Sequence, residues 1–175
     1  KDYARLGNQI KCNPAIKFES DREALWEGLL NGKLDIIATD HAPHTWEEKQ
    51  NKYSNAPSGL PLVQHSLVMM LNYVREGKIS LEKVVEKMSH APAICFKIEK
   101  RGFVREGYKA DLAIVNLNKK WTIQKENILY KCGWSPLEGE QMTSKVIYTF
   151  VSGQPALYNE KIQPQYRGER LTFNR

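Results

Sequence analysis

The chain has 175 residues, of which 41% are hydrophobic and 26% are charged, a composition that supports a buried core and argues against disorder. Its formal net charge is +6, but Lys and Arg are interleaved with Asp and Glu, so no basic stripe indicates a nucleic-acid partner. No apolar run reaches the length of about 18 residues that a membrane span needs, and no secretory signal opens the chain, so we expect a cytoplasmic protein without a membrane partner.

The first part of the chain predicts a strand, a helix and a second strand. Residues 8–10 could close a strand, and the turn-rich stretch 11–14 follows it. A helix is predicted over residues 20–30, because a capping-box sequence opens it, apolar residues repeat on one face, and an Asn-Gly pair comes after it. Residues 34–39 form a short apolar run of the length of a buried parallel strand. This order predicts a βαβ unit.

The next part predicts a long loop and three helices. The polar stretch over residues 40–59 is long enough to be a functional loop. Apolar residues at helical spacing predict helices over residues 63–74 and 81–88, the second with Ser80 as its cap. A short helix is expected over residues 91–96.

The last part of the chain has sequence patterns typical of β-strands. A strand is predicted within residues 110–117, and two strands within residues 145–158 that join around Ser152-Gly153. Residues 134–139 are expected to form a loop. The tail after Gln163 is polar and rich in arginine, and could pack as an arm or fray.

The three cysteines stand far apart and form no CxxC pair. This spacing argues against both a disulfide framework and a structural zinc knuckle. We therefore expect Cys12, Cys95 and Cys132 to be ordinary thiols.

The segment with the clearest chemistry, IATDHAPH, places a carboxylate and two imidazoles directly after the predicted strand at residues 34–39. In (β/α) barrels, active sites lie at that end of the strands. Asp40 could ligate a divalent metal and take a proton from metal-bound water, and His44 could donate to an anionic substrate group. An Asp at a strand end also occurs as a simple loop cap, and one DxxxH lacks the ligands that zinc needs, so the residues alone leave both interpretations open.

The same segment resembles the signature of type I dihydroorotases, within the amidohydrolase superfamily. The resemblance rests on DHAPH at residues 40–44, with IAT before it and EEK at residues 47–49 after it. KCNP at residues 11–14 is similar to the family's KxNPP segment, and APSG at residues 56–59 to its APFG loop. GYKADLAI at residues 107–114 is similar to the β-domain element that often follows the barrel. The matches cover nearly the whole chain in the family's order.

The resemblance implies an α/β fold, with the last βα units of a metal-dependent (β/α)8 barrel followed by a small β domain. Residues 1–100 would be the C-terminal part of the amidohydrolase barrel, and residues 101–175 the small β domain with its polar tail. Such barrels take about 250 residues, and no HxH pair precedes Asp40. Since the chain also begins with Lys1 rather than Met, we expect it to be a piece of a longer protein, inactive alone, with the remaining zinc ligands in the missing N-terminal part.

The activity implied by the resemblance is that of a dihydroorotase, which reversibly cyclises N-carbamoyl-L-aspartate to L-dihydroorotate in pyrimidine biosynthesis with zinc as cofactor. Asp40 takes the place of the metal ligand and general acid/base. Asn13 and His44 take the places of substrate-binding side chains, and Ser58 and Gly59 those of the loop backbone that contacts substrate. The expected partners are the small-molecule substrate and further copies of the protein in a homo-oligomer.

Three positions depart from the family's pattern. Ala15 replaces a second proline, Lys17 stands where arginine is common, and Ser58 replaces the loop phenylalanine. Lysine keeps the charge but lacks the planar fork of arginine, so a bidentate carboxylate contact at this position is in doubt. His65 and His90 lie on or beside the predicted helices, and we expect them to pack or cap rather than to bind metal.

Two alternatives stay open. The first is another cyclic-amide hydrolase, such as a hydantoinase or an allantoinase. The second is a non-catalytic dihydroorotase-like scaffold subunit, for example one that binds a carbamoyltransferase. His44 and Asn13 favour dihydroorotase over the first alternative, because both suit recognition of a carboxylated cyclic amide. The presence of Asp40 counts against the second.

Overall fold

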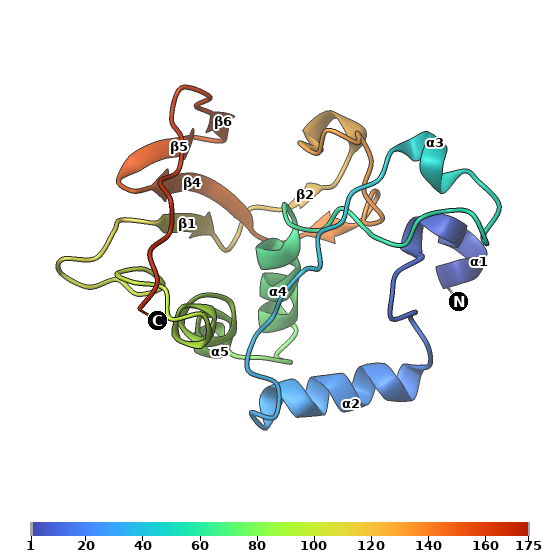
Figure 1. Cartoon of the computed structure of the whole chain (residues 1–175), viewed down its shortest axis with the longest axis horizontal. Helices are drawn as coiled ribbons and strands as arrows, with labels where there is room; N and C mark the ends of the chain where they lie inside the picture. Colours follow the sequence, from blue (N-terminus) through green and yellow to red (C-terminus); the bar gives the residue numbers. More distant parts are fainter. Residues whose placement is uncertain (1, 175) are drawn as a thin grey trace. The chain divides into compact units, whose positions relative to one another are not determined.

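The computed structural model describes residues 2–174 of the chain. Helices dominate the first half of the chain, and the strands lie in the second half (Figure 1). No helix among the described residues is long and apolar enough to cross a membrane. The helical segments are α1 (Asp2–Leu6), η1 (Gly7–Ile10), α2 (Glu19–Leu30), α3 (Trp46–Lys49), α4 (Ser66–Arg75), α5 (Leu81–Val85), η2 (Glu86–His90), α6 (Ala91–Cys95) and η3 (Lys125–Asn127).

The strands form a four-stranded sheet and a separate two-stranded sheet. The larger sheet has the order β1-β4-β5-β6, and each neighbouring pair in it is antiparallel. The smaller sheet pairs β2 with β3. The strands are β1 (Leu112–Asn116), β2 (Trp121–Thr122), β3 (Gln141–Met142), β4 (Lys145–Val151), β5 (Gln154–Tyr158) and β6 (Lys161–Ile162).

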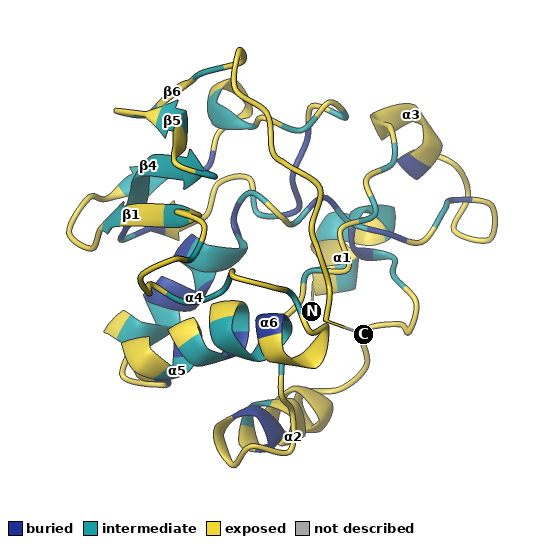
Figure 2. Cartoon of the chain, turned by 60° about the vertical axis from the view of Figure 1, so that its left-hand side comes forward, coloured by how far each residue is buried: buried dark blue, intermediate teal, exposed yellow. Residues whose placement is uncertain are grey.

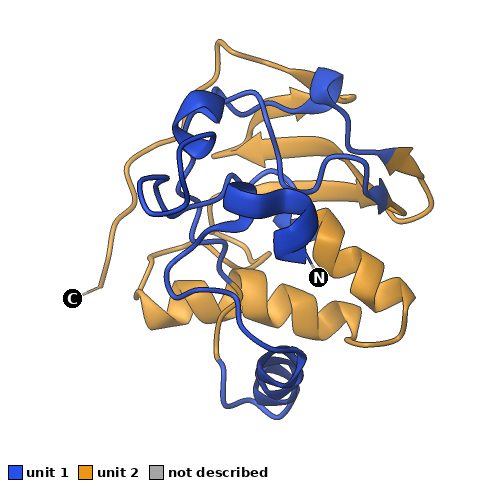
Figure 3. Ribbon diagram, turned by 90° about the vertical axis from the view of Figure 1, so that its right-hand side faces the viewer, with its two compact units in different colours: residues 1–34, 38–67, 122–141 blue, residues 35–37, 68–121, 142–175 orange. Residues whose placement is uncertain are grey.

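The chain folds into two compact units whose segments alternate along the sequence (Figure 3). All residues proposed above to bind substrate or metal lie in unit 1. The division of the chain at residue 100 follows from family resemblance and stays a prediction. Unit 1 comprises residues 1–34, 38–67 and 122–141, and unit 2 comprises residues 35–37, 68–121 and 142–175.

Helix α2 confirms the helix predicted over residues 20–30, with a different cap. The N–H of Phe18 donates to the carboxylate of Asp21 at 2.8 Å, so the capping carboxylate is Asp21 rather than Glu23. Of the predicted apolar face, Leu29 is buried while Leu25 is 60% exposed. Part of the predicted apolar face of α2 is therefore exposed to solvent.

The strand predicted at residues 8–10 is wrong, because this segment is the 3-10 helix η1. The N–H of Lys11 donates to the carbonyl of Asn8 at 3.0 Å, which closes a tight turn instead of pairing with a neighbouring strand. The side-chain amide of Asn8 donates to the carbonyls of Lys49 and Asn51, at 3.0 and 2.6 Å. Contacts that are distant in sequence thus hold the turn.

The buried strand predicted over residues 34–39 is also wrong within the described residues. No strand pairs with this segment there, and its side chains are exposed or half-buried. An apolar run becomes a strand only when neighbouring strands satisfy its backbone groups. The N–H of Ile37 donates instead to the carbonyl of Lys87 at 3.0 Å, and the segment leads to Asp40 as an irregular connection.

Helix α4 and the helical stretch from α5 to α6 carry much of the core of unit 2. Val68 and Leu71 of α4 and Val84 of α5 are buried. Figure 2 shows the dark blue of buried residues on α4. The hydroxyl of Ser80 accepts the N–H of Lys83 at 3.1 Å, which confirms the predicted cap. The periodicity predicted the α4 helix correctly, but the helix begins three residues later than the pattern.

The predicted strand pair over residues 145–158 is confirmed as β4 and β5. Ser152 and Gly153 join the strands with φ values of 50° and 82°, the two positive angles of a type I′ turn. The carboxylate of Asp111 accepts the N–H of Ser152 at 2.7 Å and pairs with Arg101, which ties the turn to the segment before β1.

The tail after Gln163 packs as an arm. The N–H of Glu99 donates to the carbonyl of Thr172 at 3.0 Å, and the N–H of Asn174 donates to the carbonyl of Lys97 at 2.9 Å. The three cysteines are free thiols, as predicted.

Candidate functional site

The DHAPH segment runs beside the end of the APSG segment in unit 1. His41 forms a parallel bridge with Leu60, and the N–H of Ala42 donates to the carbonyl of Leu60 at 3.1 Å. Asp40 is exposed and has a left-handed φ of 46°, a conformation that Asp tolerates better than most residues. The chain thus turns sharply at Asp40, directly before the segment that carries both imidazoles.

Gly59 lets three separated motifs meet. Its φ is 138°, and a Cβ at this position would lie 2.4 Å from the carbonyl oxygen of Ala42. Its N–H donates to the carbonyl of Lys11 at 2.9 Å. The segments 11–14, 40–44 and 56–59 therefore lie together, and a side chain at Gly59 would push them apart.

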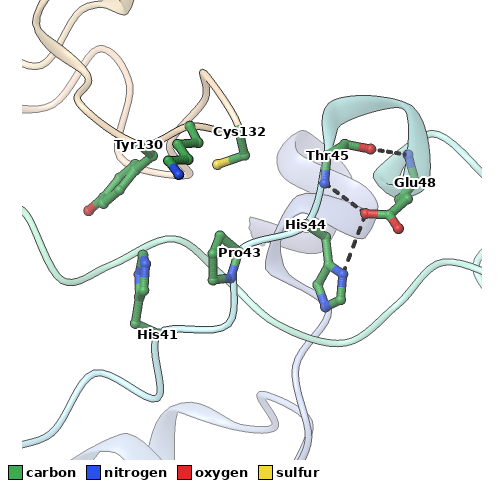
Figure 4. Close-up of a pocket in the computed structure, with 8 residues that line it drawn as sticks. His41, Pro43, His44, Thr45, Glu48, Tyr130 and Cys132 are labelled. Carbon is green, nitrogen blue, oxygen red and sulfur yellow. Dashed lines mark hydrogen bonds and ion pairs between the residues drawn. The ribbon is translucent and has the colours of Figure 1, made fainter.

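His44 is held on both sides of its ring, and Figure 4 shows its contact with Glu48. Its Nε2 donates to the carbonyl of Ser58 at 3.1 Å, and its Nδ1 lies 3.5 Å from the carboxylate of Glu48. Glu48 and Thr45 form a reciprocal capping box at the start of α3, with bonds of 2.8 and 3.2 Å. The N–H of Thr45, together with His44, holds the pKa of Glu48 below its usual value. The cap of a short helix therefore orients the imidazole.

His41 has a defined tautomer in this loop. Its Nδ1 accepts the N–H groups of Leu62 and Val63 at 3.1 and 3.3 Å, so the hydrogen of the neutral ring sits on Nε2. The ring of Tyr130 lies 5.3 Å away between centroids. His41 thus has one nitrogen engaged and one donor left for another group.

A cavity of about 380 Å³ lies along this segment (Figure 4). Its wall is mostly apolar, and imidazole, carboxylate, phenol, ammonium and thiol groups are present among its lining residues, a combination typical of sites for small molecules. The lining residues are His41, Pro43, His44, Thr45, Glu48, Tyr130, Lys131 and Cys132.

Tyr130 reaches this cavity from a distant part of the sequence because Gln64 binds its loop. The N–H of Gln64 donates to the Tyr130 hydroxyl at 2.9 Å, and the Gln64 side chain pairs with Asn127 and Leu129 at 2.8 Å each. Burial raises the pKa of Tyr130 to about 12, so its hydroxyl stays protonated at neutral pH. The sequence offered no signal for this residue.

His65 packs against Tyr130, in agreement with the predicted packing role. Its ring is fully buried and meets the Tyr130 ring edge-on, with centroids 5.6 Å apart. Burial lowers the pKa of His65 to about 4, so the ring is neutral at pH 7. His90, in unit 2, stacks on Phe103 at 4.3 Å and is likewise a packing residue.

Lys49 is a site residue to which the sequence analysis assigned no role. Its side chain is 1% exposed, and its Nζ donates to the carbonyls of Lys11, Pro57 and Gly59 at 3.3, 3.0 and 3.0 Å. It is the lysine of the EEK stretch after DHAPH, so its place in the motif was the available signal.

Trp134, like Tyr130 and Lys49, is a site residue that the sequence did not predict. It is buried in the loop predicted at residues 134–139, and its Nε1 donates to the carbonyl of His44 at 2.8 Å. Its ring meets the ring of Trp46 edge-on, with centroids 6.1 Å apart. A tryptophan before a Ser-Pro turn is a weak signal, because large aromatic residues most often serve a core.

The structure brings together some of the predicted site residues and leaves others apart. His44 contacts Ser58, and Gly59 contacts the segment that leads to Asn13. Asn13 and Asp40 are exposed. Lys17 is also exposed, and its ammonium donates to the carbonyl of Ala15 at 3.2 Å.

The described residues hold no group of three or more His, Cys, Asp or Glu side chains placed to bind a metal ion. Asp40 could supply one carboxylate ligand, and a catalytic zinc site takes three protein ligands. The residues present therefore fit one part of a metal site rather than a complete one.

Comparisons with known proteins extend this picture. The chain is 41% identical to a dihydroorotase of Pyrococcus abyssi over 171 residues, which is 98% of this chain and 40% of that protein. It is 39% identical to a dihydroorotase of Pyrococcus horikoshii over 171 residues, 98% of this chain and 39% of that protein. The chain thus spans about two fifths of the length of these curated relatives.

Solved structures point to the same superfamily. An L-hydantoinase (dihydropyrimidinase) from Arthrobacter aurescens matches 93% of this chain and 37% of its own, with 31% identity and a TM-score of 0.84. The amidohydrolase family matches residues 6–156, which include all the candidate site residues and extend from α1 into β5. The chain therefore belongs to the amidohydrolase family.

Proposed function

We propose that this chain is the C-terminal part of a dihydroorotase that reversibly cyclises N-carbamoyl-L-aspartate to L-dihydroorotate. The observation that carries the proposal is the meeting of three motifs at Gly59, whose backbone contacts both the KCNP and the DHAPH segments. Similarity to dihydroorotases over nearly the whole chain supports it. The activity is assigned to a complete protein, because the chain spans about two fifths of these relatives.

Asp40 is proposed as a metal ligand and as the group that moves the proton. In cyclisation its carboxylate would accept a proton from the attacking carbamoyl nitrogen, and in hydrolysis it would return that proton to the ring nitrogen. Zinc, when bound, would polarise the carbonyl and lower the pKa of the attacking water. The exposed position of Asp40 leaves its carboxylate accessible for both roles.

Substrate recognition is proposed for Asn13, His44 and the backbone at Ser58 and Gly59. The Asn13 side chain can both donate to and accept from a ring imide without adding charge. His44 is a donor for the substrate carboxylate. Since its Nε2 already donates to the Ser58 carbonyl, the substrate carboxylate would replace that contact while Glu48 holds the other side of the ring.

A second candidate is another cyclic-amide hydrolase. The L-hydantoinase structure at 31% identity favours it, since the same site scaffold would then act on a ring without a carboxylate. The two candidates differ in the substrate group that His44 would bind. A dihydroorotase needs an imidazole donor for the substrate carboxylate, and a hydantoinase does not.

The first test is to measure zinc content and N-carbamoyl-L-aspartate cyclisation in the complete protein, with the 175-residue chain beside it. We expect zinc and activity in the complete protein and neither in the chain alone. Hydrolysis of hydantoins or allantoin in place of cyclisation would support the second candidate. A complete protein without metal and without any of these activities would instead indicate a non-catalytic scaffold subunit.

A further inference from the structure

We propose that Lys49 is a positioning residue, whose buried ammonium group holds the KCNP and APSG segments in register for substrate binding. The inference rests on the proposed function for the identity of the substrate. Its structural part, the tie between the two segments, can be tested without any activity.

The contacts of Lys49 account for its whole ammonium group. Three N–H donors meet three backbone carbonyls, those of Lys11, Pro57 and Gly59, and the side chain is 1% exposed. No described carboxylate forms an ion pair with it. Carbonyl dipoles from two separate segments therefore replace the water that a lysine normally keeps.

These carbonyls lie beside the groups proposed to bind substrate. Pro57 and Gly59 flank Ser58, whose carbonyl accepts from His44. Lys11 stands two residues before Asn13, and its carbonyl also accepts the N–H of Gly59 at 2.9 Å. Loss of the ammonium would leave the Pro57 and Gly59 carbonyls without this donor and the Lys11 carbonyl with the Gly59 N–H alone, so the two segments would move apart and water would reach the carbonyls.

Lys49 also belongs to the helix that orients His44. It ends α3, the helix whose capping box places Glu48 beside the imidazole. Its ammonium lies 6.0 Å from the centroid of the Trp134 ring, and Trp134 donates to the His44 carbonyl. One side chain thus connects the short helix, the APSG loop and the KCNP segment, and none of these three belongs to a sheet within residues 2–174.

The test compares the kinetics of the complete protein with those of Lys49→Met and of the control Lys52→Met. Lys52 is exposed in the same loop, and its side chain forms no hydrogen bond or ion pair among the described residues. We expect Lys49→Met to raise KM for N-carbamoyl-L-aspartate by about tenfold or more, with kcat within about threefold and zinc content unchanged. Lys52→Met should match the wild type.

A merely structural role would give a different result. Partial unfolding removes active molecules, so Vmax and zinc content would fall together at an unchanged KM, and that outcome overturns the proposal. Where Lys49→Met does not fold, Lys49→Gln keeps two N–H donors and must show the rise in KM. Failure of both variants to fold beside a folded Lys52→Met would assign Lys49 to stability alone and also overturn it.

Amide hydrogen exchange separates this inference from the proposed function. The Gly59 N–H, which donates to Lys11, should exchange faster in Lys49→Met than in the wild type and in Lys52→Met. An unchanged exchange rate at Gly59 would overturn the proposal that Lys49 holds the KCNP and APSG segments together. The wild type could also fail to cyclise N-carbamoyl-L-aspartate while Gly59 still exchanges faster in Lys49→Met. That result would refute the proposed substrate and retain the positioning role.

Discussion

At Gly59, the absence of one methyl group decides whether two loops can touch. The carbonyl oxygen of Ala42 occupies the position next to the missing Cβ, at 2.4 Å, and the Ala42 Cβ is 2.8 Å from it. Both neighbours belong to backbone or to a short side chain, so neither can rotate away. The glycine of APSG is therefore explained by close packing rather than by turn geometry alone.

Gly59→Ala should lower the free energy of unfolding by about 3 kcal/mol, because it adds a steric clash to an unfavourable φ. Urea unfolding of the complete protein measures this. Gly133→Ala is the matched control, since Gly133 has a φ of 69° and a Cβ there would meet no heavy atom within 4 Å. We expect this variant to lose about 1 kcal/mol of unfolding free energy. Equal losses for the two variants would contradict the clash.

Asp40→Asn should lower kcat of the complete protein by about a thousandfold or more, because the amide keeps the volume but cannot accept a proton. Steady-state cyclisation of N-carbamoyl-L-aspartate measures this. Asp35→Asn, a change of the same kind at another exposed position of the chain, should leave the rate unchanged. A rate near the wild type in Asp40→Asn would refute the proposed role.

His44→Ala should mainly raise KM for the carboxylated substrate, since the imidazole is proposed to bind rather than to react. A fall in kcat at unchanged KM would contradict this assignment. His90→Ala removes an imidazole that stacks on Phe103 in unit 2, and should leave KM unchanged.

At the level of elements, helices α2, α4 and α5 followed their sequence signals, and the expected barrel strand did not. The caps, periodicity and turn residues that define α2, α5 and the β4-β5 hairpin are local, so the chain carries them wherever it folds. Residues 34–39 have the composition of a strand, but a strand also needs partners, and the described residues provide none.

The contact between His65, which directly precedes α4, and Tyr130 predicts a pH dependence of stability. The pKa of His65 is lowered by burial from 6.5 to about 4, so the unfolded chain binds more protons than the folded one between these values. The stability that the neutral His65 contributes is thus fully present above about pH 6.5 and is lost as the pH falls toward 4. The difference of 2.5 corresponds to roughly 3 kcal/mol at most.

Urea unfolding at pH 7.5 and at pH 4.5 tests this effect. Carboxylates also contribute to acid sensitivity, so the wild type is compared with His65→Leu, which cannot take up the proton. We expect His65→Leu to lose less stability than the wild type over this range. An equal loss in both proteins would show that the His65 pKa is not lowered by folding.

At the scale of the whole molecule, the chain has apolar surface that suits further contacts. Leu25 and Leu30 of α2, together with Ile16, Phe18 and Leu34, are exposed, and Phe18 is 78% exposed. Scattered apolar residues are ordinary on a surface, but these five come from one stretch of the chain that relatives place within a longer protein.

The 175-residue chain alone should therefore self-associate and bind a hydrophobic dye more strongly than the complete protein. Sedimentation and dye fluorescence measure this at matched concentration. A monomeric chain with weak dye binding would show that this surface needs no cover. For the complete protein we expect a homo-oligomer, which the same sedimentation measurement tests.

Local spacing and residue identity were enough to predict α2, α4, the stretch from α5 to α6, the β4-β5 hairpin and the three motifs that indicate the family. They did not predict the short helices α1, η1 and α3. Asp40, Asn13, His44, Ser58 and Gly59 were all predicted from those motifs, and their catalytic and binding roles remain proposals. The close approach of Gly59 to DHAPH and the 3-10 helix at residues 8–10 became apparent only in the folded chain. The contacts of Lys49 and Trp134 likewise came from the structure alone, because their partners lie up to 90 residues away. Such contacts depend on which distant backbone groups share a low-dielectric interior, and no local pattern encodes that.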